Sequence, residues 1–507
     1  MRFLCDNIAG IYIAAVAALM AWVFGGTRSE LLLPLVPWLM LFMTEVILFF
    51  PQKRAGESSY EARDRAWRAM RKDPLVWTAL GFLALLAIPF LNNGLCPICD
   101  AAKIAEGFNP KPPAPFLPFC VNRLHHLNVV LWFVTAFSCL IATKHCLAKH
   151  GQRTLLEMIV WNGAVLAVFG FVESAAGAPG PFWTPLAGGQ RASDFFSSFG
   201  YPNMGGDYFT TIFGLSAALW RWRYEEVRNE RATSGHSSGK VHRGRFWRKN
   251  YLLVPAGLSF FAALNTLSRA SIMLVTLLAM LFFLHTFVSF LSRMDKARRV
   301  KRGALSLLVL GLIVFSATIF LPEDMQREVN TLDTTAVLDR VTGKGYYHVR
   351  VATELWKDHV LFGCGGWGYK HLSVPKMTDD EFEDLQKVGG INVHNDFLQF
   401  LAEHGLVGFG ALVTLVVLLI MPVGSAWREL ASAARFVKSK DRPPHPVQLF
   451  ALPAPVFFIL LTALATVIHG FGDCPLRSPA VLTLFYVELA AMPAFLPKLT
   501  SHRHRED

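Results

Sequence analysis

The chain has 507 residues, of which 53% are hydrophobic and only 17% are charged. The charged residues gather in a few short blocks between long apolar runs, a pattern that excludes a soluble globular protein. The net charge of +12 does not indicate nucleic-acid binding, because the basic residues lie in those short blocks. Apolar runs of roughly 20 residues, enough to cross a ~30 Å hydrocarbon core, recur along the chain. The sequence therefore predicts an all-α, polytopic membrane protein.

About twelve transmembrane helices are expected. The first run could be mistaken for a signal peptide, but the downstream charges require an even number of crossings. The predicted spans are Ile8–Phe24, Leu31–Phe50, Leu75–Leu91, His126–Cys146, Leu155–Ala175, Met204–Trp220, Tyr251–Leu267, Ser271–Leu291, Ala304–Phe320, Leu406–Met421, Val447–Ile468 and Pro479–Pro497.

The basic blocks predict the orientation of these spans. If the crossings alternate, all five blocks fall on one face, and that face is the cytoplasm because short cytoplasmic loops are rich in Lys and Arg. The blocks are Gln52–Asp73, Lys144–Arg153, Arg221–Lys249, Arg293–Arg302 and Arg428–Arg442. We expect four parts: N-terminal transmembrane helices (1–175), a transmembrane core with an arginine hairpin (176–321), a large periplasmic loop domain with short helices (322–405), and C-terminal transmembrane helices with a cytoplasmic tail (406–507).

Several cysteines fall on the predicted outer face. Cys96, Cys99 and Cys120 suggest a structural disulfide or plain thiols more than a metal or redox site, because no second Cys pair accompanies them. Cys364 and Cys474 lie on the same face and could pair.

The first polar candidates flank membrane helices. Gly200 and Pro202 predict a turn, and Asn203 is expected to cap the next helix, whose N-terminus could seat an anion. Arg191 in the same segment can equally be a solvated loop charge. Arg269 interrupts an apolar run of about forty residues, where it either lines a polar cavity or extends to the headgroups.

The long outer loop predicts two helices and a turn. One helix is expected at about Tyr346–Leu361, in which Arg350 could bind a ligand or simply pair with Glu354. The run Gly363–Gly368 matches G-x-G-x-x-G, but it follows a helix rather than a strand, so a tight loop is expected instead of a dinucleotide site. The charged run Thr378–Lys387 predicts an exposed helix.

The segment Asn392–Gly405 is predicted to be a short amphipathic helix that leads into a membrane span. Asn392 can cap its start and Gly405 can end it. His394 is expected on one helix face together with Phe397, Leu398 and Leu401. A histidine held on a rigid element at the mouth of a membrane helix is a candidate catalytic group.

The last outer segment, His469–Ser478, adds His469, Asp473 and Arg477, which indicate either a polar pocket or a solvated turn. Several arginines beside a histidine suit a phosphorylated substrate, because guanidinium groups bind phosphate oxygens bidentately and imidazole accepts a proton near neutral pH. No paired-carboxylate motif appears on this face, so a reaction without metal or cofactor is predicted. No Walker lysine loop is present, which excludes an ATP-driven pump.

Together these motifs resemble the O-antigen ligase and polymerase superfamily. The resemblance covers roughly residues 173–490. This chain departs from the usual family motifs at two places: it has Tyr-Pro-Asn where Asn-Pro-Asn is common, and Ser-Arg-Ala-Ser where Ser-Arg-Gly is usual. Its motifs are His394-Asn-Asp-Phe-Leu-Gln-Phe-Leu-Ala-Glu-His-Gly, Arg350…Glu354-Leu-Trp356, Ser268-Arg269, Arg191…Gly-Tyr-Pro-Asn203 and His469…Asp473-Cys-Pro-Leu.

The resemblance implies a GT-C-like glycosyltransferase of the bacterial inner membrane whose active site faces the periplasm. It would transfer a glycan from a polyprenyl-diphosphate carrier to a hydroxyl of a glycan, lipid or protein acceptor. His394 would be the base, and the diphosphate would be bound by Arg269 and Arg350, with help from Arg191 and Asn203. Four residues would orient these side chains without binding the substrate themselves: Asn395, Glu403, His469 and Asp473.

Three alternatives remain at this point. A polymerase of the same superfamily would use the same donor. A transporter of polysaccharide or lipid-linked sugar would be expected to show two similar halves, and no internal repeat is visible. A non-catalytic scaffold would tolerate loss of the arginines.

Overall fold

A computed structural model describes residues 2–27, 29–54, 56–92, 108, 112–185, 195–233, 243–291, 344–388, 392–436 and 452–497. These residues form helices with no strand among them, as expected for apolar segments that must satisfy their backbone hydrogen bonds within a membrane. The main helices are α1 (Arg2–Trp22), α2 (Ser29–Phe49), α3 (Ser59–Lys72), α4 (Pro74–Leu91), α6 (Arg123–Ile141), α7 (Lys149–Ala175), α8 (Pro202–Thr233), α9 (Arg243–Asn250), α10 (Leu253–Asn265), α11 (Arg269–Leu291), α15 (Lys344–Asp358), α16 (Gly368–Leu372), α17 (Asp379–Val388), α18 (Asp396–Phe436), α19 (Ala454–Gly472) and α20 (Pro479–Ala491).

Six of the described helices are long and apolar enough to cross a membrane. They lie in Pro74–Leu91, Arg123–Cys146, Lys149–Ala175, Arg269–Ser289, Asp396–Leu430 and Ala454–Gly472. Shorter apolar helices occupy Asn7–Trp22, Pro34–Phe49 and Pro479–Phe495. The expected spans at Met204–Trp220 and Tyr251–Leu267 correspond to α8 and α10, and Ala304–Phe320 lies outside the described residues. The all-helical, multi-pass class is confirmed, and the twelve-span topology stays a prediction.

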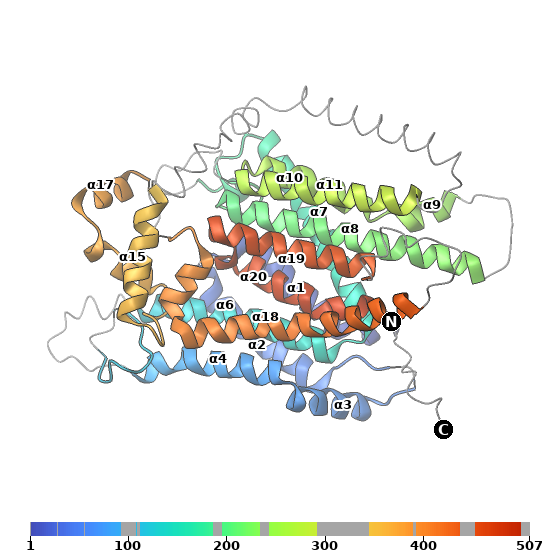
Figure 1. Cartoon of the computed structure of the whole chain (residues 1–507), viewed down its shortest axis with the longest axis horizontal. Helices are drawn as coiled ribbons and strands as arrows, with labels where there is room; N and C mark the ends of the chain where they lie inside the picture. Colours follow the sequence, from blue (N-terminus) through green and yellow to red (C-terminus); the bar gives the residue numbers. More distant parts are fainter. Residues whose placement is uncertain are drawn as a thin grey trace.

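The long helices form a bundle whose members run roughly along one axis (Figure 1). Helices α15 and α17 gather at one end of the bundle, and α3 and α9 lie toward the other. Basic side chains are abundant in α3 and α9. The orientation of the bundle in the membrane stays a prediction. Every residue of α20 is buried, which makes this apolar helix the centre of the bundle.

Glycines allow helices to approach α8 closely. A Cβ at Gly206 would lie 2.2 Å from Ser271 Oγ, and one at Gly214 would lie 2.0 Å from Thr462 Oγ1. Because neither glycine carries a side chain, α11 and α19 pack directly on the α8 backbone. This packing places the first turns of α8 and α11 beside the last turn of α19.

The outer segments follow the sequence prediction in part. Helix α15 lies at the predicted position but ends at Asp358, and α17 begins one residue after Thr378. Thr378 and Glu381 exchange reciprocal side-chain to backbone hydrogen bonds, which form a capping box. The glycine-rich run between α15 and α16 is a tight loop, in which Gly363 and Gly365 have φ of 70° and 82°.

Candidate active site

His394 does not lie on a helix, which corrects the sequence prediction. It precedes α18 with a positive φ of 52°, an uncommon conformation for a residue with a side chain. The helix starts at Asp396 and is capped by Asn395, whose Oδ1 accepts from the Leu398 N–H at 3.0 Å. The predicted cap, Asn392, instead accepts a hydrogen bond from the side chain of Gln399.

Two contacts from the α19–α20 connection explain where α18 begins. The Asp396 N–H donates to the Asp473 carbonyl at 3.2 Å, and the Asp396 carboxylate accepts from the Leu476 N–H at 2.8 Å. Asn392 and Asn395 are equally good caps in the sequence, so these tertiary bonds select Asn395. His394 is thereby placed directly before the first turn of α18.

Gly405 interrupts α18 instead of ending it. Its φ of 63° and ψ of −172° belong to a region that only glycine adopts readily, and helical structure resumes immediately afterward. At this break the chain crosses the glycine-rich loop, with hydrogen bonds from the Cys364 and Gly365 amides to the carbonyls of Ala402 and Glu403. The loop thus fixes the outer part of α18, which follows His394.

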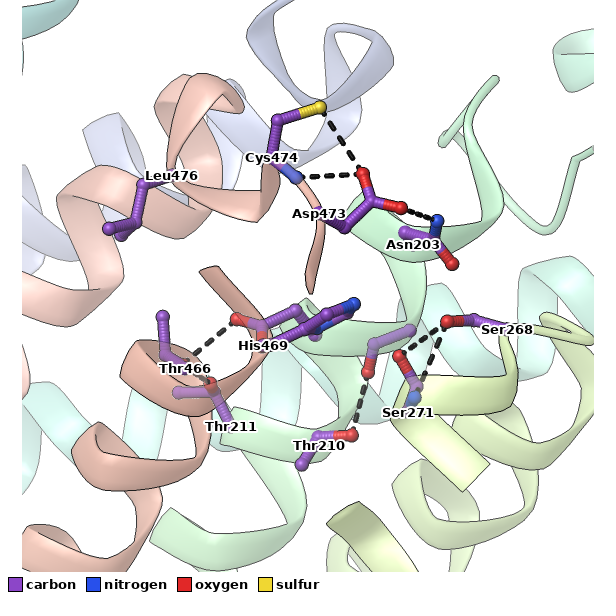
Figure 2. A network of polar contacts seen from close by, with 12 residues as sticks. Asn203, Thr210, Thr211, Ser268, Ser271, Thr466, His469, Asp473, Cys474 and Leu476 are labelled. Atoms are coloured by element: carbon purple, nitrogen blue, oxygen red, sulfur yellow. Dashed lines mark hydrogen bonds and ion pairs between the residues drawn. The ribbon is translucent and has the colours of Figure 1, made fainter. Parts of the chain in front are cut away.

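Asp473 is the centre of a polar network, and Figure 2 shows its contacts with Asn203 and Cys474. Its Oδ1 lies 3.5 Å from His394 Nδ1 and accepts from the Cys474 N–H at 2.7 Å. Tyr201 donates its hydroxyl at 3.0 Å, and the Asn203 amide donates to the other carboxylate oxygen. The Asp473 side chain is only 7% exposed, whereas that of His394 is 43% exposed. A buried carboxylate therefore supports an imidazole that remains open to solvent.

The charge of Asp473 is stabilised by its neighbours. Burial alone would raise the pKa of this carboxyl, but the hydrogen bond and charge of His394, with help from His469 and the Cys474 amide, lower it to about 2. Asp473 therefore remains ionised near neutral pH.

Asn203 does not cap α8, and this prediction is also wrong. Helix α8 begins at Pro202, which suits a first helical position because proline has a fixed φ and lacks an N–H. The Asn203 amide is instead bonded to Asp473 and to the Tyr201 hydroxyl. Asn203 thus contributes to the site from inside the first turn of α8.

The arginines have different surroundings. Arg269 is the first residue of α11 and is partly buried, and Ser268 before it accepts from the Ser271 N–H. Arg350 pairs with Glu354 at 2.8 Å and with Glu381 at 2.7 Å, so the predicted intrahelical pair is present. Arg191 lies outside the described residues.

Glu403 and Arg477 form a buried ion pair behind the site. Arg477 Nη2 lies 3.0 Å from Glu403 Oε2, and both side chains are at most 2% exposed. The Trp367 ring covers the guanidinium, whose central carbon lies 4.4 Å from the ring centroid. This pair ties the α19–α20 connection to α18, and the supporting role of Glu403 in the site stays a prediction.

His469 has a carboxylate partner that the sequence reading missed. Its Nδ1 lies 3.0 Å from Asp207 Oδ1, and both side chains are almost fully buried. Asp207 follows Asn203 by four residues within an apolar run. That spacing was the available signal, because an acidic residue within a membrane span is costly without a function.

One group near the site has the composition of a metal site. Ligand atoms of His394, Asp473 and Cys474 lie within 4.8 Å of one another. Burial and the nearby Asp473 charge raise the pKa of the Cys474 thiol, which disfavours the thiolate that a metal would need. We therefore treat the three residues as a hydrogen-bond network. Cys364 and Cys474 both have free thiols, so the disulfide considered between them is not formed.

Comparison with protein-family models gives a match. Residues 254–413 match the family model described as O-antigen ligase, a stretch that includes Arg269, Arg350, His394 and Glu403. The comparison with curated proteins gave no match. The match covers about a third of the chain and stops before the α19–α20 connection. The chain is therefore a multi-pass membrane protein that carries a segment similar to the O-antigen ligase family.

Proposed function

We propose that this protein transfers a glycan from a polyprenyl-diphosphate carrier to an acceptor hydroxyl, as an O-antigen ligase does. The observation that carries the proposal is the pair formed by solvent-open His394 and buried Asp473, within and next to the matched domain. The reaction is placed at the periplasmic face of the bacterial inner membrane. This placement is supported by the separation of the basic helices α3 and α9 from the end of the bundle that carries α15 and α17.

His394 acts as the general base. Its Nδ1 faces Asp473, so its Nε2 is the nitrogen available to an acceptor hydroxyl. As the hydroxyl oxygen attacks the anomeric carbon, its proton passes to the imidazole and the glycosyl–phosphate bond breaks with inversion. Asp473 stabilises the imidazolium that forms, and Tyr201 and Asn203 hold this carboxylate in place.

Arg269 stabilises the leaving diphosphate. It lies at the N-terminus of α11, where the helix dipole adds partial positive charge to that of the guanidinium. The guanidinium of Arg350 already forms ion pairs with the carboxylates of Glu354 and Glu381. Arg350 therefore binds the diphosphate by releasing one of these carboxylates and donating to a phosphate oxygen instead. Guanidinium groups can supply the charge needed for a metal-independent reaction.

The test is the surface glycan of cells that lack this gene. Loss of long surface chains together with accumulation of carrier-linked polymer supports the ligase assignment. Accumulation of carrier-linked single repeats would contradict it and indicate a polymerase. Unchanged surface glycan with unchanged carrier-linked pools would refute glycan transfer altogether. Full complementation by an Arg269→Ala variant would refute the role of Arg269 in stabilising the leaving diphosphate.

A further inference from the structure

Asp396, the first residue of α18, is completely buried and takes no part in the reaction proposed above. One of its carboxylate oxygens, Oδ2, accepts from the Leu476 N–H at 2.8 Å. The other oxygen, Oδ1, is buried with no hydrogen-bond partner among the described residues. A buried carboxylate that is only half satisfied lowers the stability of a protein. Packing therefore does not account for an aspartate at this position.

Asp396 joins the two segments that carry the His394–Asp473 pair. His394 lies two residues before it, whereas Asp473 and Leu476 lie in the connection between α19 and α20, where Figure 2 shows them. The Asp396 N–H donates to the Asp473 carbonyl at 3.2 Å, and its side chain accepts from the Leu476 amide. Asp396 is thus bonded to the connection through both its backbone and its side chain, and we call this arrangement the Asp396 clasp.

The clasp lies beside a contact that tolerates little displacement. His394 Nδ1 is 3.5 Å from Asp473 Oδ1, a separation at the outer limit of a hydrogen bond. His394 also has a φ of 52°, a backbone conformation that persists only where the surrounding structure holds it. A small shift of α18 against the α19–α20 connection would therefore separate the imidazole from its carboxylate.

Two other contacts attach α18 to the same region, but neither defines the position of His394 closely. The ring centroids of Phe397 and Phe471 lie 4.5 Å apart, and apolar contacts of this kind impose little direction. The buried ion pair of Glu403 lies further along α18. The hydrogen bonds of Asp396 are directional and act two residues from His394, so they set the local geometry.

We propose that Asp396 is a positioning residue, which sets the distance between His394 and Asp473 by binding the Leu476 amide. This inference rests on the proposed function. With the clasp in place, Asp473 Oδ1 orients the imidazole, and His394 Nε2 faces the acceptor hydroxyl. Without the clasp, the two segments shift against each other and the base meets the hydroxyl in the wrong geometry. A misplacement of about 1 Å can lower a reaction rate by about 100-fold.

The test compares Asp396→Ala with Asp396→Asn in proteoliposomes, with carrier-linked glycan and acceptor lipid extracted from host cells as substrates. Ala removes the acceptor of the Leu476 amide, whereas Asn keeps one oxygen for it and places its NH₂ group where Oδ1 has no described partner. We expect Ala to lower the maximal single-turnover rate by about tenfold or more, and Asn to stay within about threefold of the wild type. The donor concentration that gives half the maximal rate should be unchanged, because the proposed function assigns donor binding to Arg269 and Arg350.

A double-mutant cycle distinguishes positioning from a general structural role. Asp473→Asn already removes the carboxylate that the clasp holds beside His394. If Asp396 acts through that contact, adding Asp396→Ala to Asp473→Asn should slow transfer by no more than about twofold further. A residue that supports the fold independently of this contact would instead give effects that multiply.

Asp379→Ala is the matched control, because Asp379 is likewise the first residue of its helix, α17, but its side chain is exposed. This variant is expected to stay within about twofold of the wild-type rate. Should Asp396→Ala fail to fold, Asp396→Ser replaces it in every comparison, because its hydroxyl keeps a polar atom at the helix start but is too short to reach the Leu476 amide.

Three outcomes would overturn the inference. If Asp396→Ala transfers glycan at the rate of Asp379→Ala while His394→Ala is inactive, the clasp has no effect on the reaction and the base assignment survives. If the effects of Asp396→Ala and Asp473→Asn multiply, Asp396 does not act through the His394–Asp473 pair. If His394→Ala is itself active, the proposed function fails and the positioning role fails with it.

Discussion

Replacement of Asp473 by asparagine tests how the buried carboxylate supports His394. Asn has the same size but carries no charge, and one of its two polar atoms becomes a donor. Because the Tyr201 hydroxyl, the Asn203 amide and the Cys474 N–H all donate to Asp473, the new NH₂ group would face another donor. The variant therefore removes both the negative charge beside His394 and one of the two hydrogen-bond acceptors at position 473.

The magnitude follows from the charge stabilisation at Asp473. Its pKa is about 2 compared with an ordinary value of 3.8, and the bond with His394 is the largest favourable contribution. The difference, 3.8 minus about 2 or about 1.8 pKa units, corresponds to about 2.5 kcal/mol, or about 60-fold in rate if all of it is lost in the transition state. We expect Asp473→Asn to slow transfer by about 10- to 100-fold with little change in KM.

The same values predict the effect of pH. Because the folded-state pKa lies below the unfolded one, the stabilisation is fully present above pH 3.8 and is lost as the pH falls through about 2. Titration of Asp473 should therefore leave no step in the pH–rate profile of the wild type at any pH above about 4.

The assay is single-turnover transfer in proteoliposomes, with Asp358→Asn as a control of the same chemistry. Asp358 pairs with Lys376 and its side chain is 52% exposed, so this variant should behave like the wild type. If Asp473→Asn transferred glycan as fast as Asp358→Asn, the buried carboxylate would have no part in the reaction.

Two further predictions concern stability. Gly405→Ala should destabilise the protein by about 3 kcal/mol or more, because its Cβ would lie 2.3 Å from the Leu361 carbonyl carbon in a backbone conformation reserved for glycine. The control is Gly410→Ala, whose Cβ would meet open space. Equal unfolding temperatures for the two variants would argue against the break in α18. Arg477→Met should cost about 3–5 kcal/mol by leaving the Glu403 charge buried without its partner. Adding Glu403→Gln should recover part of that loss in detergent unfolding, and a double variant less stable than Arg477→Met would refute the ion-pair explanation.

The sequence predicted the helices well because their signals are local. Apolar runs of membrane length predict α4, α6, α7 and α19, and the charged run Thr378–Lys387 predicts α17. The glycine-rich loop was also recognised from its composition. These features depend on residues that are close in the sequence.

The sequence suggested candidate site residues but not their geometry. The pattern around His394 fits a helix, and only the bonds of Asp396 to Asp473 and Leu476 determine that the helix starts later. Asp207 was overlooked because its partner, His469, lies 262 positions away. Such contacts arise from the packing of α8 on α19, which no local pattern specifies.

The most direct test of the account is glycan transfer by purified His394→Ala protein. A folded, membrane-inserted variant that still binds carrier-linked glycan but forms no product is the predicted result, since the base is absent and the diphosphate site is intact. Product formation at the wild-type rate, with normal donor binding, would contradict the assignment of His394 and the mechanism built on it.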